Sequence, residues 1–229
     1  MKQIFDSLKK QSPSRIIALG FSAVILVGAV LLMMPFSLKK GVHLSFLNAL
    51  FTSTSAVCVT GLVVVDTADS FTAIGQAIVA ALIQIGGLGI ASVGVGLIIA
   101  AGKRVSIKSR LMVKEALNVD TYHGMVRLVR IVLAITLGFE AAGAIISFFV
   151  FRKDYSPLHA VGISIFHSIA AFNNAGFDNL GGMHNLIPYK DNILLNITTD
   201  VLVIVGGIGF LVLVDLSLIH ISEPTRQEA

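Results

Sequence analysis

Charged residues are scarce in this sequence: they make up 13% of its 229 residues, while 55% are hydrophobic. A soluble domain carries about 25% charged residues, so the composition argues against a soluble protein. Cysteine is scarcer still, because Cys58 is the single cysteine of the chain. A disulfide framework within the chain is therefore excluded. The net charge of +4 does not indicate nucleic-acid binding, because the basic residues lie between apolar segments. These scarcities predict an integral membrane protein.

Four apolar segments are candidates for membrane spans: Ile16–Phe36, Phe71–Ala101, Ile131–Val150 and Asn192–Val214. The first holds 21 uncharged residues, about 31 Å of helix, which is enough for a bilayer core of roughly 30 Å. It is too long for a signal peptide and lacks a small-residue cleavage site, so we expect a retained span. The second holds 31 residues, about 46 Å of helix, so we expect it to tilt or to protrude.

Basic residues mark one side of the membrane. The connector Gly102–Arg130 carries seven Lys and Arg residues against Glu115 and Asp120, a net charge of +5. The N-terminal segment 1–15 is basic as well, and Lys and Arg are enriched in cytoplasmic loops. We therefore expect a multi-pass protein of the plasma (cell) membrane whose connector, residues 102–130, and both termini lie in the cytoplasm.

Between the first two spans lies a stretch that we interpret as a re-entrant pore loop, Leu44–Leu62. It begins as a short apolar helix, Leu44–Phe51, and continues through small polar residues to Val57–Gly61. Non-helical backbone at membrane depth is tolerated only where it is buried in protein or lines a wet cavity. The β-branched residues are expected to keep an extended strand, and Gly61 permits backbone angles that turn carbonyls towards an ion. Leu158–Phe177 has the same design.

The chain contains an internal repeat. A shift of 115 residues aligns the two loops and pairs Phe51 with Phe166, Ser53 with Ser168, Ala56 with Ala171 and Gly61 with Gly176. A shift of 120 residues pairs Gly86–Gly89 with Gly206–Gly209. The unit is span, pore loop, span, and its copies are residues 16–101 and 131–216. Both copies start and finish inside, so they are parallel repeats around a central pathway.

This pattern predicts an all-α membrane fold with four spans and two re-entrant loops. A ring of carbonyls around an ion takes about four loops, so two loops make half of a pseudo-fourfold pore. The candidate filter residues, which would hold K⁺ at their backbone carbonyls, are Val57, Cys58, Val59, Thr60, Gly61, Asn173, Asn174, Ala175 and Gly176. The candidate gate or hinge residues, for which close helix packing is the alternative, are Gly86, Gly87, Gly89, Gly206, Gly207 and Gly209.

Acidic residues inside spans are functional candidates, and Glu140 and Asp200 are both of this kind. We expect Glu140 to pair with a basic or hydroxyl neighbour, whereas Asp200 either faces the pathway or has a structural role. His167 is expected to be a hydrogen-bonded buried histidine. Cys58 is expected to be a packed small side chain rather than a reactive thiol.

Polar residues around the filter leave two interpretations open. Asp66 and Asp69 lie near the outer mouth, where they either attract cations or belong to an ordinary solvated loop. Asn173 and Asn174 either offer filter carbonyls or brace the loop from behind.

Three segments carry a resemblance to a known family: SAVCVTGLVVVDTADSF from Ser55, QIGGLGI from Gln84, and FNNAGF from Phe172. Together they resemble the Trk/Ktr/HKT superfamily of potassium transporters, and specifically the membrane subunit of bacterial Ktr systems. The resemblance implies four repeats with one filter glycine each, of which Gly61 and Gly176 match two. It also implies a homodimer with a separate cytoplasmic nucleotide-binding regulatory subunit on the connector and N-terminus. The tail 217–229 matches nothing in the family and is expected to be non-native.

The function expected from these features is channel-like potassium uptake, passive and without covalent chemistry, and with no cofactor in this chain. A first alternative is a secondary carrier, sodium-coupled or sodium-transporting, that binds its substrate at the broken helices. A remote alternative is an intramembrane hydrolase that uses membrane-depth serines with His159 or His167. It would need a nucleophile next to a base, and no GxSxG or HExxH signature is present. The chain is therefore not expected to be an enzyme.

Overall fold

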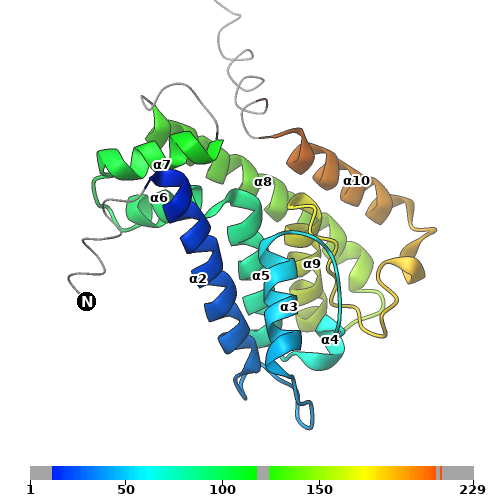
Figure 1. Cartoon of the computed structure of the whole chain (residues 1–229). Coiled ribbons are helices and arrows are strands. Elements are labelled where there is room, and N and C mark those ends of the chain that lie inside the picture. The colour runs from blue at the N-terminus through cyan, green and yellow to red at the C-terminus, as the bar shows by residue number, and fades with distance from the viewer. Residues whose placement is uncertain (1–11, 118–123, 210–211, 213–229) are drawn as a thin grey trace, which may run out of the picture.

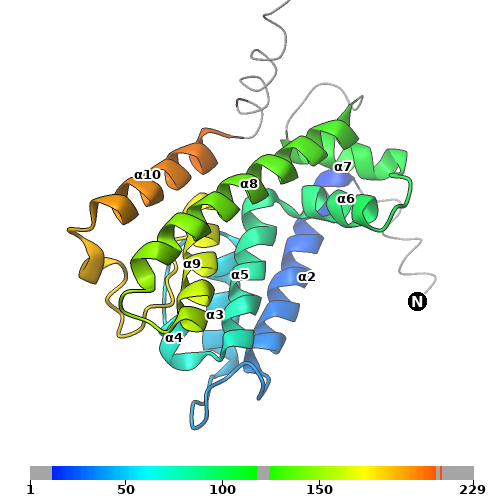
Figure 2. The ribbon, with the colours of Figure 1, turned by 180° about the vertical axis from the view of Figure 1, so that it is seen from behind.

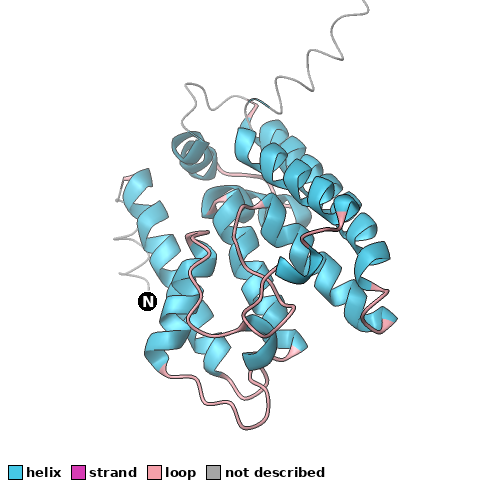
Figure 3. Ribbon diagram, turned by 90° about the vertical axis from the view of Figure 1, so that its right-hand side faces the viewer, coloured by secondary structure: helices cyan, strands magenta, loops and turns pink. Residues whose placement is uncertain are grey.

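The computed structural model describes residues 12–117, 124–209 and 212. The expectations for the tail 217–229 and for most of the N-terminal segment 1–15 fall outside these residues. The described helices are α2 (Pro13–Met33), α3 (Phe46–Val57), α4 (Thr67–Ser70), α5 (Ala73–Leu88), α6 (Ile90–Ala100), α7 (Ile107–Leu117), α8 (Met125–Phe151), α9 (Pro157–Phe172), the 3₁₀ turn η1 (Ile187–Tyr189) and α10 (Ile193–Ile208). The described residues form helices and loops without a strand (Figure 3).

Local sequence signals explain where several of these helices begin. Ser45, Thr72 and Asn192 each accept a hydrogen bond from a backbone N–H in the first turn of α3, α5 and α10. Such caps satisfy donors that the helix itself leaves unpaired. α2 and α9 instead start with a proline, whose missing N–H costs nothing at the first helical position.

Among the described helices, two are long and apolar enough to cross a bilayer, α2 with 21 residues and α8 with 27, and the bent pair of α5 and α6 would add a third if it is taken as one span. Their outward faces carry exposed large apolar side chains, including Val27 on α2 and Leu137 and Ile145 on α8. An apolar outer face of this kind would be unfavourable in water and suits contact with lipid. The fold is that of an all-α integral membrane protein.

The arrangement of α2, α3 and α5 explains how the first loop is positioned. α2 runs the length of the molecule, and α3 starts at its far end and runs back beside it (Figure 1). The chain after α3 then returns to that same end, where α4 lies, before α5 runs back again (Figure 1). α6, α7 and the start of α8 gather at the opposite end, and α8 crosses in front of α5 in the view of Figure 2.

The main hydrophobic core joins the two halves of the chain. It combines buried residues of α2, α3 and α5, such as Leu32 and Ile83, with Phe166, Ala175 and Phe177 from the second loop region. The two loop regions therefore pack on one another and do not form separate domains.

The segment Phe71–Ala101 is not the tilted or protruding span that its length predicts. It breaks at Gly89, and α6 leaves α5 at an angle of 106°. Gly89 has φ +78°, a value that L side chains avoid, so the glycine makes the break possible. Gly209, its match in the second copy, ends α10 with φ +94°.

Candidate functional site

The two predicted pore loops have the same backbone hydrogen bonds. In the first, the N–H groups of Cys58, Val59 and Thr60 donate to the carbonyls of Thr54, Ala56 and Ser55 at 2.8, 3.3 and 3.0 Å. In the second, the N–H groups 115 residues later, those of residues 173, 174 and 175, donate to the carbonyls of residues 169, 171 and 170 at 3.1, 3.0 and 2.8 Å. Each helix therefore ends in the same tight turn.

Backbone angles in the two turns match as well, and they correct the sequence expectation. Val59 and Asn174 both take the left-handed conformation, with φ +55° and +58°, and Gly61 and Gly176 have φ +70° and +69°. The expected helix Leu44–Phe51 in fact reaches Val57, and Val57–Gly61 is not a uniformly extended strand. Because a β-branched residue rarely adopts positive φ, Val59 is held there by its surroundings.

A buried serine in each of the two short helices before the loops, the pore helices α3 and α9, is hydrogen-bonded to the long helix that precedes it, α2 or α8. Ser53 Oγ donates to the Ile25 carbonyl at 2.8 Å, and Ser168 Oγ donates to the Glu140 carbonyl at 2.7 Å. Ile25 and Glu140 are themselves 115 residues apart, so the two contacts correspond. Both serines are fully buried, where an unpaired hydroxyl would be costly.

Most of the glycines expected to form a gate or hinge separate into two structural roles. A Cβ at Gly86 or at Gly206 would collide with the carbonyl oxygen of Val57 or of Phe172, so these glycines allow the second helix to pack against the pore-helix end. Gly87 plays the same part beside Asn173. Gly89 and Gly209 have no heavy atom of a described residue within 4 Å of such a Cβ; Gly89 instead separates α5 from α6, and Gly209 ends α10. Gly207 has only the Asn174 side chain nearby, at 3.7 Å.

The two loops meet at the glycines that the sequence singles out. A Cβ on Gly61 would lie 3.0 Å from the Ala175 carbonyl oxygen and 3.2 Å from the Gly176 Cα. These contacts are closer than ordinary van der Waals contacts. Gly61 and Gly176 therefore combine a left-handed backbone with a lack of space for any side chain.

Cys58 is exposed, which corrects the expectation that it is packed. It follows the last residue of α3 and is itself one of the candidate filter residues. In the second loop the corresponding position is Asn173, which is buried.

Asn173 and Asn174 both act as braces in the structure. Asn173 Nδ2 donates to the Ile169 carbonyl at 2.9 Å and lies within hydrogen-bonding distance of Gln84 Oε1 and Glu140 Oε1 at 3.0 and 3.2 Å. Asn174 Nδ2 donates to the Val203 carbonyl on α10 at 3.2 Å. Among the described residues the Glu140 side chain therefore has amide partners, Asn173 and Gln84, and not the expected basic or hydroxyl group.

The remaining intramembrane candidates differ in their surroundings. His167 is buried and its Nε2 lies 3.1 Å from Thr199 Oγ1, as expected for a hydrogen-bonded histidine. Asp200 is exposed on α10 and is not among the residues that line the cavity of about 240 Å³ beside the second loop. The structure therefore gives no support to a pathway-facing Asp200.

The two acids predicted to lie near the outer mouth, Asp66 and Asp69, bind the other half of the chain. Asp66 Oδ2 accepts the Met183 N–H at 2.8 Å, and Asp69 Oδ2 accepts the Gly182 N–H at 3.0 Å. Asp66 also caps α4 through the Asp69 N–H. We call these two contacts the outer latch. The segment is therefore not an ordinary solvated loop, because both carboxylates are hydrogen-bonded to backbone N–H groups far away in sequence.

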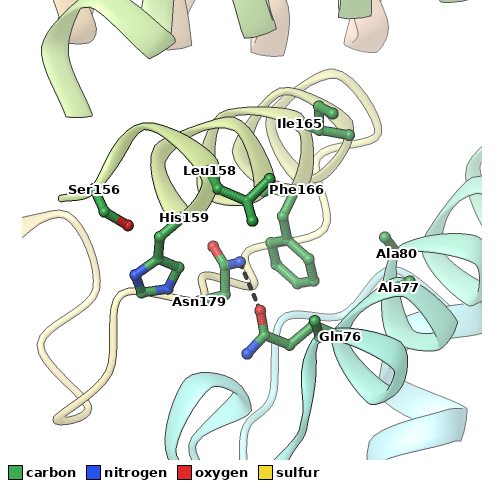
Figure 4. Close-up of a pocket in the computed structure, with 11 residues that line it drawn as sticks. Gln76, Ala77, Ala80, Ser156, Leu158, His159, Ile165, Phe166 and Asn179 are labelled. Atoms are coloured by element: carbon green, nitrogen blue, oxygen red, sulfur yellow. Dashed lines mark hydrogen bonds between the residues drawn. The ribbon is translucent and has the colours of Figure 1, made fainter. Parts of the chain in front are cut away.

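Two glutamines were missed as site residues, although a signal was present. Gln76 and Gln84 are the only amide side chains in Phe71–Ala101, and polar groups in a span usually find a partner. Gln84 meets Asn173, and Gln76 Oε1 accepts from Asn179 Nδ2 at 3.0 Å (Figure 4). Both bonds connect α5 to the second loop region.

A cavity of about 500 Å³ lies between α5 and α9 (Figure 4), and none of the candidate filter residues is among the residues that line it. Its wall is mainly apolar, with Ala77, Ala80, Ile165 and Phe166 among the lining residues. Because its wall is mainly apolar and no Asp, Glu, Lys or Arg is among these lining residues, the cavity does not suit an ion.

The serines considered as nucleophiles of a hydrolase are hydrogen-bonded to groups other than a histidine. Ser53 and Ser168 bind backbone carbonyls, and the Ser55 hydroxyl pairs with the Thr60 hydroxyl at 2.8 Å. Among the described residues, no hydrogen bond joins one of these serines to a histidine. A nucleophile–base pair is thus not assembled here.

Fold and site together define the class: an α-helical membrane protein in which two short helices end in matched glycine turns that face one another. The sequence profile described as "TrkH: Cation transport protein" matches residues 7–226. The chain belongs to this family. The match extends past Leu216 into the tail that was expected to be non-native.

Several curated relatives are similar over most of the chain. The Ktr system potassium uptake protein B of Bacillus subtilis is 42% identical over 205 residues, which are 90% of this chain and 45% of the relative. The potassium/sodium uptake protein NtpJ of Enterococcus hirae is 38% identical over 212 residues, covering 93% and 47%. The Ktr system potassium uptake protein D of B. subtilis is 38% identical over 208 residues, covering 90% and 45%. The chain spans about half the length of these relatives.

Proposed function

We propose that this chain forms half of a potassium uptake pathway in which backbone carbonyls of the two loops make up part of a selectivity filter. The observation that supports this most is the match between the loops in hydrogen bonds, in left-handed residues and in glycines that meet. A carbonyl filter needs backbone held in an unusual conformation, which such matched turns provide. The names of the relatives add potassium as the ion.

The architecture proposed for this function is two parallel span–loop–span repeats. The serine contacts on Ile25 and Glu140 and the glycine contacts on Val57 and Phe172 recur at the same offsets as the sequence repeat, which supports it. Transport would be passive movement of dehydrated K⁺ through carbonyl sites, with further loops completing the ring.

Sodium transport is a second candidate, favoured by one observation: a relative at 38% identity is named a potassium/sodium uptake protein. The two candidates differ in the geometry of the same carbonyls, because selectivity depends on cavity fit or on the number and field strength of the carbonyl ligands.

We further propose a plasma-membrane location with the connector 102–130 and both termini in the cytoplasm, and assembly as a homodimer with a nucleotide-binding regulatory subunit. The net charge of the connector supports the orientation. The word "system" in the names of two relatives supports a partner subunit.

A chimera tests the proposed function. Residues 13–209 of this chain would replace the matching half of the B. subtilis Ktr system potassium uptake protein B, and the chimera would be expressed in a potassium-uptake-deficient bacterium. We expect growth at low external potassium and uptake of a potassium tracer. Sodium uptake without potassium uptake would favour the second candidate, and no uptake of either ion by an inserted chimera would contradict both.

A further inference from the structure

Glu140 lies in the middle of α8 and is 7% exposed. Burying a carboxyl group at membrane depth is costly unless the group is paired or hydrogen-bonded. The backbone of Glu140 also contacts α9, because the Glu140 carbonyl accepts a hydrogen bond from Ser168 Oγ at 2.7 Å. The matching residue in the first repeat is the apolar Ile25. The presence of an acid at position 140 therefore needs a local explanation.

The Asn173 amide is a hydrogen-bond partner of this carboxyl group. Three oxygens surround Asn173 Nδ2: the Ile169 carbonyl on α9 at 2.9 Å, Gln84 Oε1 on α5 at 3.0 Å and Glu140 Oε1 on α8 at 3.2 Å. An amide nitrogen has two protons, so the three helices share one donor group. Gln84 Nε2 is itself buried, and the Gln84 side chain also interacts with the Glu140 carboxyl group.

Asn173 is the first residue after α9 and leads directly into the second loop. Asn174 is left-handed, Ala175 is fully buried and Gly176 meets Gly61. On its other side Asn173 fills the space beside Gly87, where a Cβ would collide with Asn173 Oδ1. Any rotation of the Asn173 side chain would therefore shift the start of the loop.

The first loop has no equivalent brace. The positions that match Asn173, Glu140 and Gln84 are Cys58, Ile25 and Ile204. Cys58 is exposed, and neither isoleucine has a polar side-chain group. The two loops share a backbone conformation, but only the second is fixed by side chains from both repeats.

We propose that Glu140 is a positioning residue for the second loop. Its carboxylate holds the Asn173 amide, and through it residues 174–176, against α5 of the first repeat. This role rests on the proposed function, since it shapes the ion pathway. It requires an acceptor oxygen at position 140 and does not require a negative charge.

Hydrogen exchange of the full chain in lipid nanodiscs tests the brace without reference to any ion. Glu140→Ala should accelerate exchange of the amides of residues 173–175 about tenfold, as loss of roughly 1.4 kcal/mol of local stability would do. Residues 58–60 serve as the matched control in the same molecule and should not change. Glu140→Gln keeps an acceptor oxygen and should resemble the wild type.

A double-mutant cycle separates the brace from general loss of stability. Asn173→Ala alone should also accelerate exchange, and adding Glu140→Ala should then have little further effect, because the shared contact is already gone. Unchanged exchange in Glu140→Ala overturns the proposal, as does equal acceleration in both loops or a loss in Glu140→Gln as large as in Glu140→Ala.

The chimera supplies the second measurement. Glu140→Ala should lower the ratio of potassium to sodium uptake, and Glu140→Gln should preserve it. An unchanged ratio despite faster exchange overturns the role in the pathway. A chimera that transports neither ion with Glu140 in place contradicts the proposed function instead, and the exchange result then decides on the brace alone.

Discussion

At the scale of single residues, the candidate filter depends on positions that exclude a side chain for two separate reasons. Gly61 and Gly176 are left-handed and also touch each other's loop. Gly41, in the loop before α3, is left-handed too, with φ +82°, but has no heavy atom within 4 Å of a would-be Cβ. The three glycines therefore separate the cost of backbone conformation from the cost of contact.

Gly61→Ser in the chimera should weaken discrimination against sodium and reduce potassium uptake at low concentration, while the protein still inserts. The new side chain would press on the Ala175 carbonyl and Gly176, and a shift worth about 1.4 kcal/mol changes a selectivity ratio roughly tenfold. Competing uptake of both ions, normalised to protein in the membrane, measures this. Gly41→Ser is the matched control and should leave the ratio unchanged. An unchanged ratio of potassium to sodium uptake in Gly61→Ser would mean that Gly61 only shapes the turn, and it would contradict the filter assignment.

Asp178, two residues beyond Gly176, has a carboxyl group whose shifted pKa predicts how stability and potassium uptake depend on pH. Burial raises the pKa of its carboxyl group, the negative charge of Asp66 raises it further, and a hydrogen bond from the Leu180 N–H opposes both. Since the folded-state pKa lies above the unfolded one, this group favours the fold at low pH, and that contribution is lost as the pH rises through the raised pKa.

Acidification through the same range removes a negative charge near the outer mouth, so potassium uptake by the chimera should fall at a pH above that expected for an ordinary aspartate. Asp178→Asn should flatten this part of the pH profile. A wild-type and an Asp178→Asn profile of identical shape would assign the acid limb to another group.

At the scale of elements, contacts between the two repeats hold the loops in place at three levels. Gln76 with Asn179 and Gln84 with Asn173 join α5 to the second loop region. The outer latch joins α4 to residues 182 and 183. Because each bond links segments far apart in sequence, helix packing and loop conformation depend on one another.

Replacing Asp69 with Ala should release the segment 180–185 while leaving α4 capped by Asp66. The loss of one hydrogen bond to a charged group is worth about 1.5–3 kcal/mol when desolvated and less at this exposed site. We expect faster proteolysis within 180–185 and a small drop in thermal stability of the purified chain. Asp154→Ala, which removes a bond to Tyr189 instead, is the control. Equal proteolysis of wild type and Asp69→Ala would contradict the latch.

At the scale of the whole molecule, the helices have two distinct ends. The basic connector with α6 and α7 lies at one end, and the loop after α2 lies with α4 at the other (Figure 1). The positive charge of the connector favours the cytoplasm, so the two ends should lie on opposite sides of the membrane.

Single-cysteine reporters in a Cys58→Ser background check this orientation. In intact cells an impermeant thiol reagent should label Gly41→Cys and should not label Lys103→Cys, although both positions are exposed. Labelling of Lys103→Cys should appear once the cells are permeabilised. The reverse pattern would invert the whole arrangement, including the assignment of the outer latch.

The chain alone, expressed without a complete relative, should neither conduct nor rescue a potassium-uptake-deficient strain. Two loops surround an ion incompletely, and the missing carbonyl ligands leave it partly dehydrated at a high cost. Rescue at micromolar potassium would mean that copies of the chain pair to complete the pore. Membrane insertion, checked by fractionation, is the necessary control.

Much of the architecture follows from local sequence. The scarcity of charge predicts the membrane, the runs of apolar residues predict the helices, and the offset of 115 predicts which residues of the two loops correspond. Each of these signals depends on composition and on residue order along the chain, which are the same whatever the tertiary packing. The matched serine and glycine contacts fall at the predicted offsets.

Only the tertiary structure decided the details that depend on distant partners. The 106° break at Gly89 is one, because an unbroken run of apolar residues looks alike whether it tilts or bends. The amide partner of Glu140, 33 residues away, and the latch partners of Asp69 and Asp66, 113 and 117 residues away, are others. A sequence shows which polar groups need partners at membrane depth, but the packing of the helices determines which partner each group meets.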